Sequence, residues 1–338
     1  MKLSRTFITG PSGQDGKILI SQLASENIEV ACLCRTVTES IALRKLFPKL
    51  KVYIGDLMNL ASIVEALSDF QPSLVFHLGA LSSVSQSFLH PQLTQDTNVA
   101  GTNNVINAII LSNLKSTKLY NASSSEIFGN HHSLPITEDH PKQPVSPYGK
   151  SKLEAHNLVT SFRESGHFAV SGILFNHESP LRKNTFVTRK ITQHIAARLL
   201  GLNRQLELGD LTVIRDWGWA PDYVHGMRRM LAQDMPEDLI LATGCGHSLK
   251  EFVEIAFSIY GFQSEINEIQ VNKSFFRSDD IQISVGDASK AAHRLDWSPS
   301  RSLKETIEEM VKVDSAILKG QVEEGFWLPD FKSEMFDE

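Results

Sequence analysis

The chain has 338 residues and a mass of 37.7 kDa, which suffices for one large α/β domain or two closely associated ones. Its 33 basic and 39 acidic residues give a net charge of −6, and no basic tract is interleaved with aromatic residues, so nucleic-acid binding is not expected. The 3 cysteines do not suggest a disulfide framework, and no Cys/His spacing predicts a metal site. Neither a signal peptide nor a long apolar span is evident, so we expect a cytoplasmic protein without a membrane partner.

A glycine-rich turn follows the first predicted strand, Arg5–Thr9, and precedes a predicted helix over Lys17–Ser25. This order is typical of dinucleotide-binding folds, because glycine lets the backbone approach a pyrophosphate and the helix N-terminus offers free N–H groups. The spacing is Gly-x-x-Gly-x-x-Gly instead of Gly-x-Gly-x-x-Gly, and a turn without a ligand is the alternative. The predicted cofactor-binding residues of this turn are Gly10, Gly13, Gln14, Asp15 and Gly16.

The next three predicted strands each end in residues that suit a dinucleotide. Ile28–Cys34 ends at Arg35, where NAD-binding chains usually carry an acid, so this strand favours NADP unless Arg35 is an ordinary surface charge. Val52–Leu57 ends with Asp56, which could meet the adenine. The fourth strand, Ser73–Ala80, ends in small residues that let the backbone pass close to a cofactor.

A helix predicted over Asn98–Ser112 and a fifth strand over Lys118–Ala122 lead to the polar stretch Ser123–Glu126. Beyond it, Tyr148 and Lys152 lie one turn apart on the same face of a predicted helix. A cation held there lowers the pKa of the phenol, which can then take a proton from an alcohol while a nicotinamide takes the hydride. A half-buried tyrosine beside a solvated lysine is the alternative.

The alternation of strands and helices predicts an α/β fold with a Rossmann-type, doubly wound parallel sheet whose ligands bind at the carboxyl ends of its strands. A sixth strand over Ala169–Phe175 and a late strand over Leu239–Thr243 complete this sheet. An amphipathic helix is predicted over Thr188–Leu200, and another helix begins at Asp222. The rest of the sequence mixes helices with short strands and predicts a smaller, mixed C-terminal domain.

Several stretches together resemble the extended short-chain dehydrogenase/reductase family and, within it, the GDP-mannose 4,6-dehydratases. The resemblance runs from about residue 5 to residue 315. The glycine turn and the Tyr148/Lys152 spacing belong to the whole superfamily. The stretches Asn121-Ala-Ser-Ser-Ser-Glu126 and Arg215-Asp-Trp-Gly218 are also similar, and those most specific to the dehydratases are Gly172-Ile-Leu-Phe-Asn-His-Glu-Ser-Pro180 and Phe186-Val-Thr-Arg-Lys-Ile191.

The resemblance implies a nucleotide-sugar 4,6-dehydratase, a lyase that converts GDP-mannose to GDP-4-keto-6-deoxymannose with internally recycled NADP. In this pattern Tyr148 is the base at the sugar C4 hydroxyl, and Lys152 tunes it and holds the nicotinamide ribose. Glu126 removes the C5 proton, and Ser124 hydrogen-bonds at the reacting centre. Cofactor contacts outside the glycine turn are predicted at Arg35, Asp56, Leu57, Leu78, Gly79, Ala80, Ser82, Tyr148, Lys152, His177 and Arg182. Contacts to the nucleotide sugar are predicted at Ser83, Ser124, Asn176, Lys190, Arg215, Arg277 and Asp280.

The same resemblance implies a division of the chain into two ligand-binding domains. Residues 1–176, with 217–243 returning to them, are expected to bind NADP. Residues 177–216 and 244–338 are expected to bind the nucleotide sugar. Since the loop after Arg35 is shorter than in the family, we expect a homodimer through the helices at 98–112 and 148–164, with a homotetramer as the alternative.

Departures from the family pattern leave the substrate and the reaction open. Ser124 stands where the family has a threonine, and Leu81 and Ser83 replace a glutamine and a bulkier side chain. Arg277-Ser-Asp-Asp280 stands where the family has Arg-Pro-x-Glu, which leaves open how the ribose of the nucleotide is bound. The alternatives are another nucleotide sugar, such as a GDP-heptose or a CDP- or UDP-sugar, and another reaction, such as epimerisation, reduction or decarboxylation. Glu126 favours proton abstraction at C5.

Overall fold

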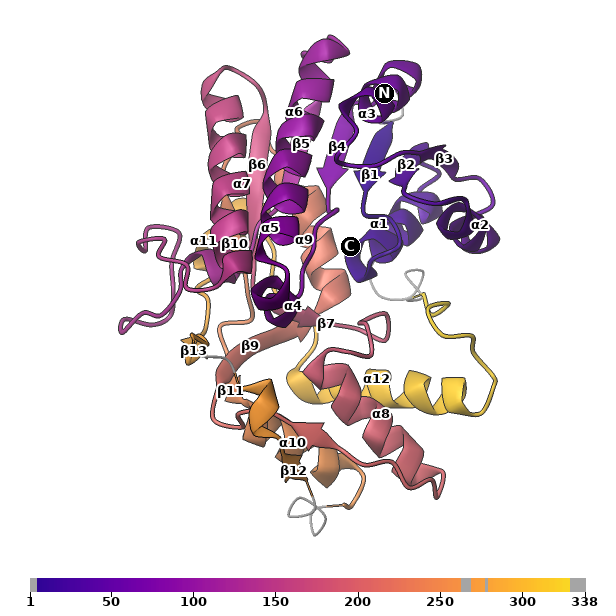
Figure 1. Ribbon diagram of the computed structural model, residues 1–338, viewed down its shortest axis with the longest axis vertical. Coiled ribbons are helices and arrows are strands. Elements are labelled where there is room, and N and C mark those ends of the chain that lie inside the picture. The colour runs from indigo at the N-terminus through magenta and orange to yellow at the C-terminus, as the bar shows by residue number, and fades with distance from the viewer. Residues whose placement is uncertain (1–4, 263–268, 277–278, 329–338) are drawn as a thin grey trace.

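The computed structural model describes residues 5–262, 269–276 and 279–328. These residues form a large part built around a central sheet and a smaller, mainly helical part that lies beyond one edge of that sheet (Figure 1). No helix in these ranges is long and apolar enough to cross a membrane.

The central sheet determines where ligands can bind. Within the described residues it contains seven strands: β1 (Thr6–Thr9), β2 (Val30–Cys34), β3 (Lys51–Ile54), β4 (Leu74–His77), β5 (Lys118–Ala122), β6 (Ala169–Leu174) and β10 (Leu239–Leu241). All neighbouring strands are parallel, and their order is β10-β6-β5-β4-β1-β2-β3. The chain order reverses between β1 and β4, so a crevice for ligands is expected at the carboxyl ends of these two strands. The predicted doubly wound sheet is confirmed.

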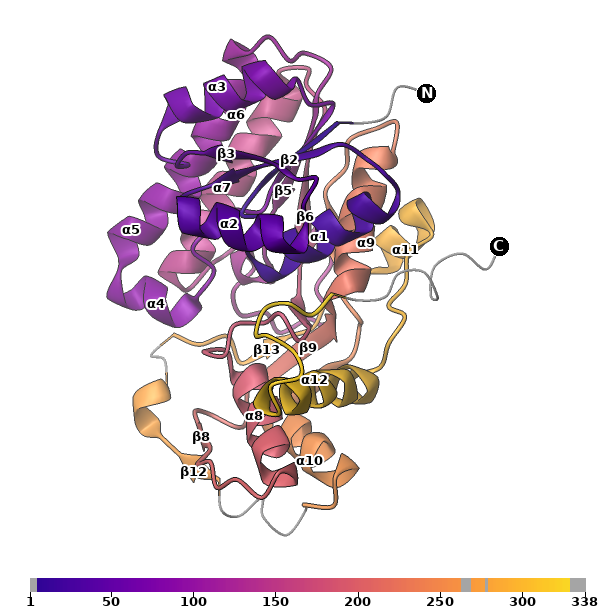
Figure 2. The same cartoon turned by 90° about the vertical axis from the view of Figure 1, so that its right-hand side faces the viewer.

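Helices cover both faces of the sheet (Figure 2). One face carries α1 (Gln14–Ser25), α2 (Val37–Leu46), α9 (Ala220–Ala232) and α11 (Ser289–Leu295), and the other carries α3 (Leu60–Phe70), α6 (Gly101–Leu111) and α7 (Pro147–Glu164). Neighbouring side chains of a strand point to opposite faces, so Phe7 and Ile8 of β1 enter different apolar cores. Because both cores are filled, the strands are held rigidly and their carboxyl ends keep a fixed geometry.

Several predicted boundaries shift by a few residues. Helix α1 begins at Gln14 instead of Lys17, directly after the glycine turn. The third strand ends at Ile54, which leaves Asp56 in the following loop. The helix predicted from Asn98 instead begins with a π-helical turn at Asp96–Ala100 that continues into α6. Before it lie two short helices, α4 (Val84–Leu89) and α5 (Pro91–Gln95).

Three helices of the smaller part pack around a separate apolar core, which also includes Trp217 of the strand β9. The helices are α8 (Val187–Leu199), α10 (Leu249–Ile259) and α12 (Leu303–Leu318), and the strands are β7 (Asn176–Glu178), β8 (Glu207–Leu208), β9 (Ile214–Trp219), β11 (Gly246–Ser248), β12 (Gln270–Val271) and β13 (Ile283–Ser284). β9 pairs with β7, β11 and β13, and β8 pairs with β12. Only Phe175 separates β6 from β7, so the chain passes directly from the central sheet into the smaller part.

A buried ion pair joins α8 to α12. The Nε of Arg189 donates to Oδ1 of Asp314 over 2.7 Å, and the hydroxyl of Thr192 donates to Oδ2 over 2.7 Å. Arg189 Nη1 also donates to the carbonyl of Arg182 over 2.8 Å, so this side chain holds the loop before α8. Burial raises the pKa of Asp314, although the hydrogen bond and charge of Arg189 act in the opposite direction. Arg189 therefore faces the protein interior. It does not lie on an exposed helix face and does not serve as a ligand-binding side chain.

Substitution of Asp314 by alanine is expected to lower the free energy of unfolding by about 3–5 kcal/mol, because it leaves the Arg189 guanidinium buried without a counter-ion. Urea denaturation measures this loss. The matched control on the same helix is Glu308→Ala, whose carboxylate is exposed and lies 3.9 Å from Lys304, and it should cost no more than about 1 kcal/mol. Equal losses for the two variants would contradict the structural role of the pair.

Candidate active site

The predicted site residues gather at one edge of the central sheet. The glycine turn follows β1, Gly79–Ser83 follow β4, Ser123–Glu126 follow β5 and Asn176–Arg182 follow β6, all at carboxyl ends of parallel strands. β7 and β9 of the smaller part lie below this edge (Figure 1). A ligand that contacts both parts of the molecule would therefore lie between this edge and these two strands.

The turn after β1 needs glycine for a close backbone approach. Gly10 has a φ of +72°, and a Cβ there would lie 2.7 Å from the backbone nitrogen of Gly79 in the turn after β4. Gly13 caps α1 and has no side chain that could engage the first N–H groups of this helix, which begins just after the carboxyl end of β1. A cradle of this kind, lined by backbone N–H groups and closed to side chains, fits the pyrophosphate of a dinucleotide.

Four side chains connect this turn to the segment after β6. Gln14 Nε2 donates to the carbonyl of His177 over 3.1 Å, and the Ser179 hydroxyl donates to Gln14 Oε1 over 2.8 Å. His177 Nε2 donates to a carboxylate oxygen of Asp15 over 3.1 Å, and its Nδ1 donates to the carbonyl of Phe175 over 2.7 Å. Both ring nitrogens of His177 thus face acceptors, which fits an imidazolium ion.

The pKa values of this pair agree with an ion pair. Burial lowers the pKa of His177, but the charge and hydrogen bond of Asp15 outweigh burial and leave it above the ordinary value. Burial raises the pKa of Asp15, but His177 outweighs burial and leaves it below the ordinary value. Asp15 and His177 were both predicted to contact the cofactor; in the structure they also hold each other.

The contribution of this pair to stability should depend on pH. A raised folded pKa of His177 stabilises the fold fully below the ordinary value of 6.5, and this contribution is lost as the pH rises through the folded value. The lowered pKa of Asp15 makes its contribution present above 3.8 and lost at lower pH. Asp15→Asn should therefore cost about 2 kcal/mol of unfolding free energy just below the ordinary pKa of histidine and less at about pH 9. A cost independent of pH in urea denaturation would contradict the ion pair.

The four predicted catalytic residues lie where the end of β5 meets the start of α7. Tyr148 is buried and forms a hydrogen bond with Ser124, whose Oγ also accepts the backbone N–H of Glu126 over 3.3 Å. A Cβ at position 149 would lie 2.6 Å from the carbonyl of Glu126, so Gly149 permits this close approach of α7. The Ser124 hydroxyl and the Tyr148 phenol are thereby held in contact, and the charge of Glu126 acts on the same phenol.

Ser146 is a site residue that the sequence analysis missed. It caps α7, since its Oγ accepts the N–H of Gly149 over 2.9 Å, and Pro147 follows it at the first helical position. The same hydroxyl donates to Oε2 of Glu126 over 3.2 Å. The helix start therefore orients the carboxylate of Glu126. The signal was present in the sequence as a serine directly before a proline and the Tyr148 motif.

The predicted lowering of the Tyr148 pKa is wrong for the structure as it stands. Burial raises the pKa of Tyr148 to about 12, and the hydrogen bond with Ser124 only partly offsets this effect. The ammonium group of Lys152 lies 6.0 Å from the ring centre of Tyr148 and donates to the carbonyl of Ala122 over 2.7 Å. Burial lowers the pKa of Lys152 to about 8, although Asp15 acts in the opposite direction. Lys152 is thus anchored to β5, and its charge is not among the groups that shift the pKa of Tyr148.

The residues predicted at the ends of β2, β3 and β4 lie around the same edge. Arg35 and Asp56 are exposed, and Asp56 Oδ1 accepts the N–H of Met58 over 2.8 Å in its own loop. A Cβ at Gly79 would lie 3.0 Å from Leu57, so Leu57 packs against the turn after β4. Ser83 caps α4 by accepting the N–H of Gln86 over 3.3 Å. Leu78, Gly79 and Ala80 are half-buried and Ser82 is exposed.

Among the residues predicted to bind the nucleotide sugar, the structure pairs Arg215 with Asp280. Arg215 Nη2 donates to Asp280 Oδ1 over 2.9 Å, and Arg215 is buried in β9. Lys190 lies over the ring of Phe275 at 4.5 Å, and Asn176 is half-buried at the start of β7. Arg277 lies outside the described residues.

The predicted cofactor residue Arg182 is paired with a glutamate that the sequence analysis did not single out. Its Nε lies 3.0 Å from Oε2 of Glu178, and its guanidinium stacks on Phe186 at 4.1 Å. The Thr188 hydroxyl donates to the same carboxylate over 2.7 Å. These contacts fix the guanidinium after the carboxyl end of β6, where its charge acts on Asp15 in the first turn of α1.

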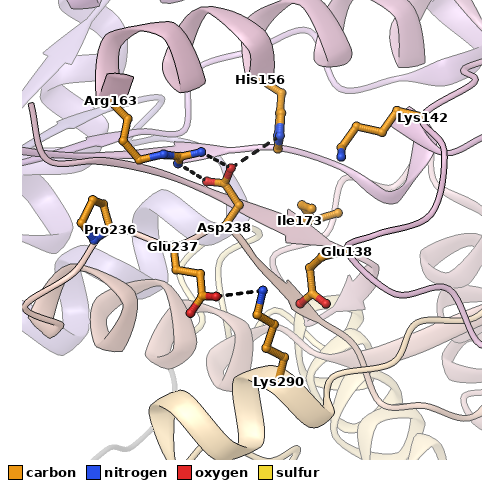
Figure 3. A pocket seen from close by; sticks show the side chains of 9 residues that line it. All are labelled: Glu138, Lys142, His156, Arg163, Ile173, Pro236, Glu237, Asp238 and Lys290. Carbon is orange, nitrogen blue, oxygen red and sulfur yellow. Dashed lines mark hydrogen bonds and ion pairs between the residues drawn. The ribbon is translucent and has the colours of Figure 1, made fainter. Parts of the chain in front are cut away.

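A separate charged pocket of about 270 Å³ lies beside α7 and β10 (Figure 3). Arg163 donates twice to Asp238, over 2.8 Å each, and Lys290 lies 2.8 Å from Glu237. His156 lies 3.6 Å from Asp238 and 3.3 Å from the Ser123 hydroxyl. None of the predicted site residues lines this pocket. Its contacts brace the end of β5 from behind.

The parallel sheet, the glycine turn and the Ser124/Tyr148/Lys152 group at its edge define an enzyme of the extended short-chain dehydrogenase/reductase class. The sequence profile of the family described as GDP-mannose 4,6 dehydratase matches residues 7–310. A GDP-mannose 4,6-dehydratase from Sordaria araneosa is 38% identical over 336 residues, which cover 93% of this chain but only 61% of that relative. The chain belongs to the GDP-mannose 4,6-dehydratase family, whose members are hydro-lyases.

One further comparison agrees with this family assignment, and another agrees with the fold. A GDP-mannose 4,6-dehydratase from Sinorhizobium fredii is 37% identical over 341 residues, which cover 93% of this chain and 97% of the relative. The crystal structure of a UDP-glucose 4-epimerase from Thermotoga maritima with UDP-glucose matches with a TM-score of 0.83 at 22% identity, covering 93% of this chain and 99% of that one. The second likeness concerns the fold alone. The family resemblance stated from the sequence is confirmed.

Proposed function

We propose that this chain is a nucleotide-sugar 4,6-dehydratase that converts GDP-mannose to GDP-4-keto-6-deoxymannose. The observation that carries this proposal is the meeting of Ser124, Glu126 and Tyr148 at the end of β5, with Lys152 anchored behind them. Removal of water at C5 and C6 needs a base for each of two protons, one on the C4 hydroxyl and one on C5. A phenol and a carboxylate held side by side supply both.

NADP is the proposed cofactor, and the residues present fit it. The closed backbone cradle after β1 suits the pyrophosphate, and the neighbouring Arg35 offers a charge for a 2′-phosphate. The charge of Arg182 acts on Asp15 and His177, which pair beside the same turn. When bound, the nicotinamide accepts a hydride from the sugar and returns it, so that no second substrate is consumed.

In the proposed mechanism, Tyr148 and Glu126 each remove one proton from the sugar. Tyr148 takes the proton of the C4 hydroxyl as C4 becomes a ketone, and the Ser124 hydrogen bond stabilises the phenolate that this step requires. The ketone acidifies the hydrogen on C5, which Glu126 removes. The C6 hydroxyl leaves as water with the proton that Glu126 took from C5, and Tyr148 returns its proton to C5 as the hydride comes back to C6. The hydrogen bond from the Ser146 hydroxyl holds the Glu126 carboxylate in one orientation during these steps.

The nucleotide sugar is proposed to lie between the sheet edge and the smaller part. Arg215, Lys190 and Asn176, with Ser83, Asp280 and Arg277, form its proposed site, and a diphosphate suits the guanidinium of Arg215. We also propose that residues 1–176 with 217–243 bind the cofactor and that 177–216 and 244–338 bind the sugar nucleotide.

We also propose that the protein is cytoplasmic and forms a homodimer. A homodimer through α6 and α7 is proposed because Ile110 and Leu111 leave apolar surface exposed on α6.

Incubation of the full chain with GDP-mannose and NADP⁺ tests the proposal. The expected product is the 4-keto-6-deoxy sugar nucleotide, detected by NMR, without net accumulation of reduced cofactor. Parallel reactions with a GDP-heptose, UDP-glucose and CDP-glucose test the substrate. Turnover of one of these but not of GDP-mannose would replace the proposed substrate. Accumulation of reduced cofactor without loss of water would replace dehydration by simple oxidation.

A further inference from the structure

A carboxylate lies beside the cofactor cradle, at the end of β2. Glu39, in the first turn of α2, accepts a hydrogen bond from the Ser12 hydroxyl and another, over 2.9 Å, from the backbone N–H of Arg35. Ser12 belongs to the glycine turn, between Gly10 and Gly13, and Arg35 directly follows β2. The Glu39 carboxylate therefore bridges the two segments that face the adenosine ribose in doubly wound dinucleotide-binding folds.

The residue at the end of the second strand determines whether such a fold prefers NAD or NADP. An acid at the end of the second strand accepts hydrogen bonds from a ribose 2′-hydroxyl, whereas an arginine there accommodates a 2′-phosphate. The chain carries both groups, since Arg35 stands in the sequence position of the acid and Glu39 folds back onto the N–H of that residue. A 2′-phosphate needs hydrogen-bond donors, and Glu39 engages the two that Ser12 and the Arg35 backbone offer.

We propose that Glu39 is a specificity-determining residue for the cofactor. Its carboxylate competes with a 2′-phosphate for Ser12 and for the backbone of Arg35, and it accepts a hydrogen bond from a 2′-hydroxyl. The inference rests on the proposed function, because it requires a dinucleotide in the glycine turn. NADP binds only when the Glu39 side chain leaves these donors, so the preference of this chain for NADP over NAD is smaller than Arg35 alone would give.

A purely structural role for Glu39 makes a different prediction. Thr36 caps α2 by accepting the N–H of Glu39 over 3.1 Å, and a glutamate at this third helical position commonly supports the start of a helix. Glutamine can replace glutamate in that role with little loss. A change in cofactor preference on substitution by glutamine therefore separates the two roles.

The test is isothermal titration calorimetry of the full-length Glu39→Gln variant with NADP⁺ and, separately, with NAD⁺. The ratio of the two dissociation constants should shift towards NADP⁺ by about tenfold, because a negative charge next to the phosphate is removed. Glu65→Gln is the matched control, since Glu65 is an exposed carboxylate on α3, and its ratio should equal that of the unaltered chain. Arg35→Ala should shift the ratio in the opposite direction, towards NAD⁺.

The possible failures are distinguishable. If Glu39→Gln binds both dinucleotides with an unchanged ratio, the inference is overturned, and a fall in thermal stability of that variant would reduce Glu39 to a helix-capping residue. If the unaltered chain binds neither dinucleotide, the proposed function fails and the inference falls with it. A shift towards NADP⁺ that Glu65→Gln does not reproduce supports the inference.

Discussion

The Glu126→Gln variant is expected to lose dehydration by a factor of about 10²–10⁴ while it still oxidises the sugar at C4. An amide cannot take the C5 proton, yet its oxygen can still accept the hydrogen bond that the Ser146 hydroxyl donates to Oε2 over 3.2 Å. The geometry of the site should therefore survive, and only the second proton transfer should fail. Reduced nicotinamide should then accumulate to about one equivalent per site, which its absorbance measures.

The control for this experiment is Glu164→Gln. Glu164 is exposed at the far end of α7, so the same chemical change there should leave turnover unaltered. Normal dehydration by Glu126→Gln would show that another group removes the C5 proton.

The Tyr148→Phe variant should lose the first step as well, and turnover should fall by a factor of about 10³ or more. The ring stays buried, so binding and packing are kept, and only the hydroxyl that contacts Ser124 is removed. Stability should fall by about 1 kcal/mol, the value of one hydrogen bond. Reduced nicotinamide should not accumulate in this variant, in contrast to Glu126→Gln.

Tyr260→Phe serves as its control, because Tyr260 lies at the end of α10 in the smaller part. It should retain full activity. If Tyr148→Phe reduces the nicotinamide as fast as the unaltered chain does, a different group is the base at C4.

Local sequence pattern predicted the sheet and the residues at its edge. The segment Lys118–Ala122 forms a strand as predicted, and in a parallel sheet the residues that follow a strand lie at the ligand-binding edge. The positions of Ser124 and Glu126 follow from this rule alone. Tyr148 and Lys152 were likewise predictable, because helical spacing puts both on one face.

Contacts between residues distant in the sequence could not be predicted in this way. The partner of Arg189 is Asp314, 125 residues later, so the helical pattern alone could not show that this arginine is buried. His177 and Asp15 are 162 residues apart, and their ion pair depends on how β6 and the glycine turn meet. The pKa of Tyr148 depends on burial and on the hydrogen bond with Ser124, and neither is set by the spacing of Tyr148 and Lys152.

One signal was available and was overlooked. Thr36 and Glu39 have the spacing of a helix capping pair, directly after the arginine on which the prediction of NADP depended. This pattern predicts a helix start, but it does not reveal that the carboxylate turns back to the glycine turn. The hydrogen bond to Ser12 required the folded arrangement of β1 and β2.

The central claim is that one site carries out oxidation, water loss and reduction on the same sugar. GDP-mannose labelled with deuterium at C4 tests this claim most directly, in a reaction with the unaltered chain and a catalytic amount of NADP⁺ followed by NMR of the product. The account predicts that the label appears at C6 of the 4-keto-6-deoxy sugar. A product without label at C6, or a label that accumulates in the reduced cofactor, would contradict it.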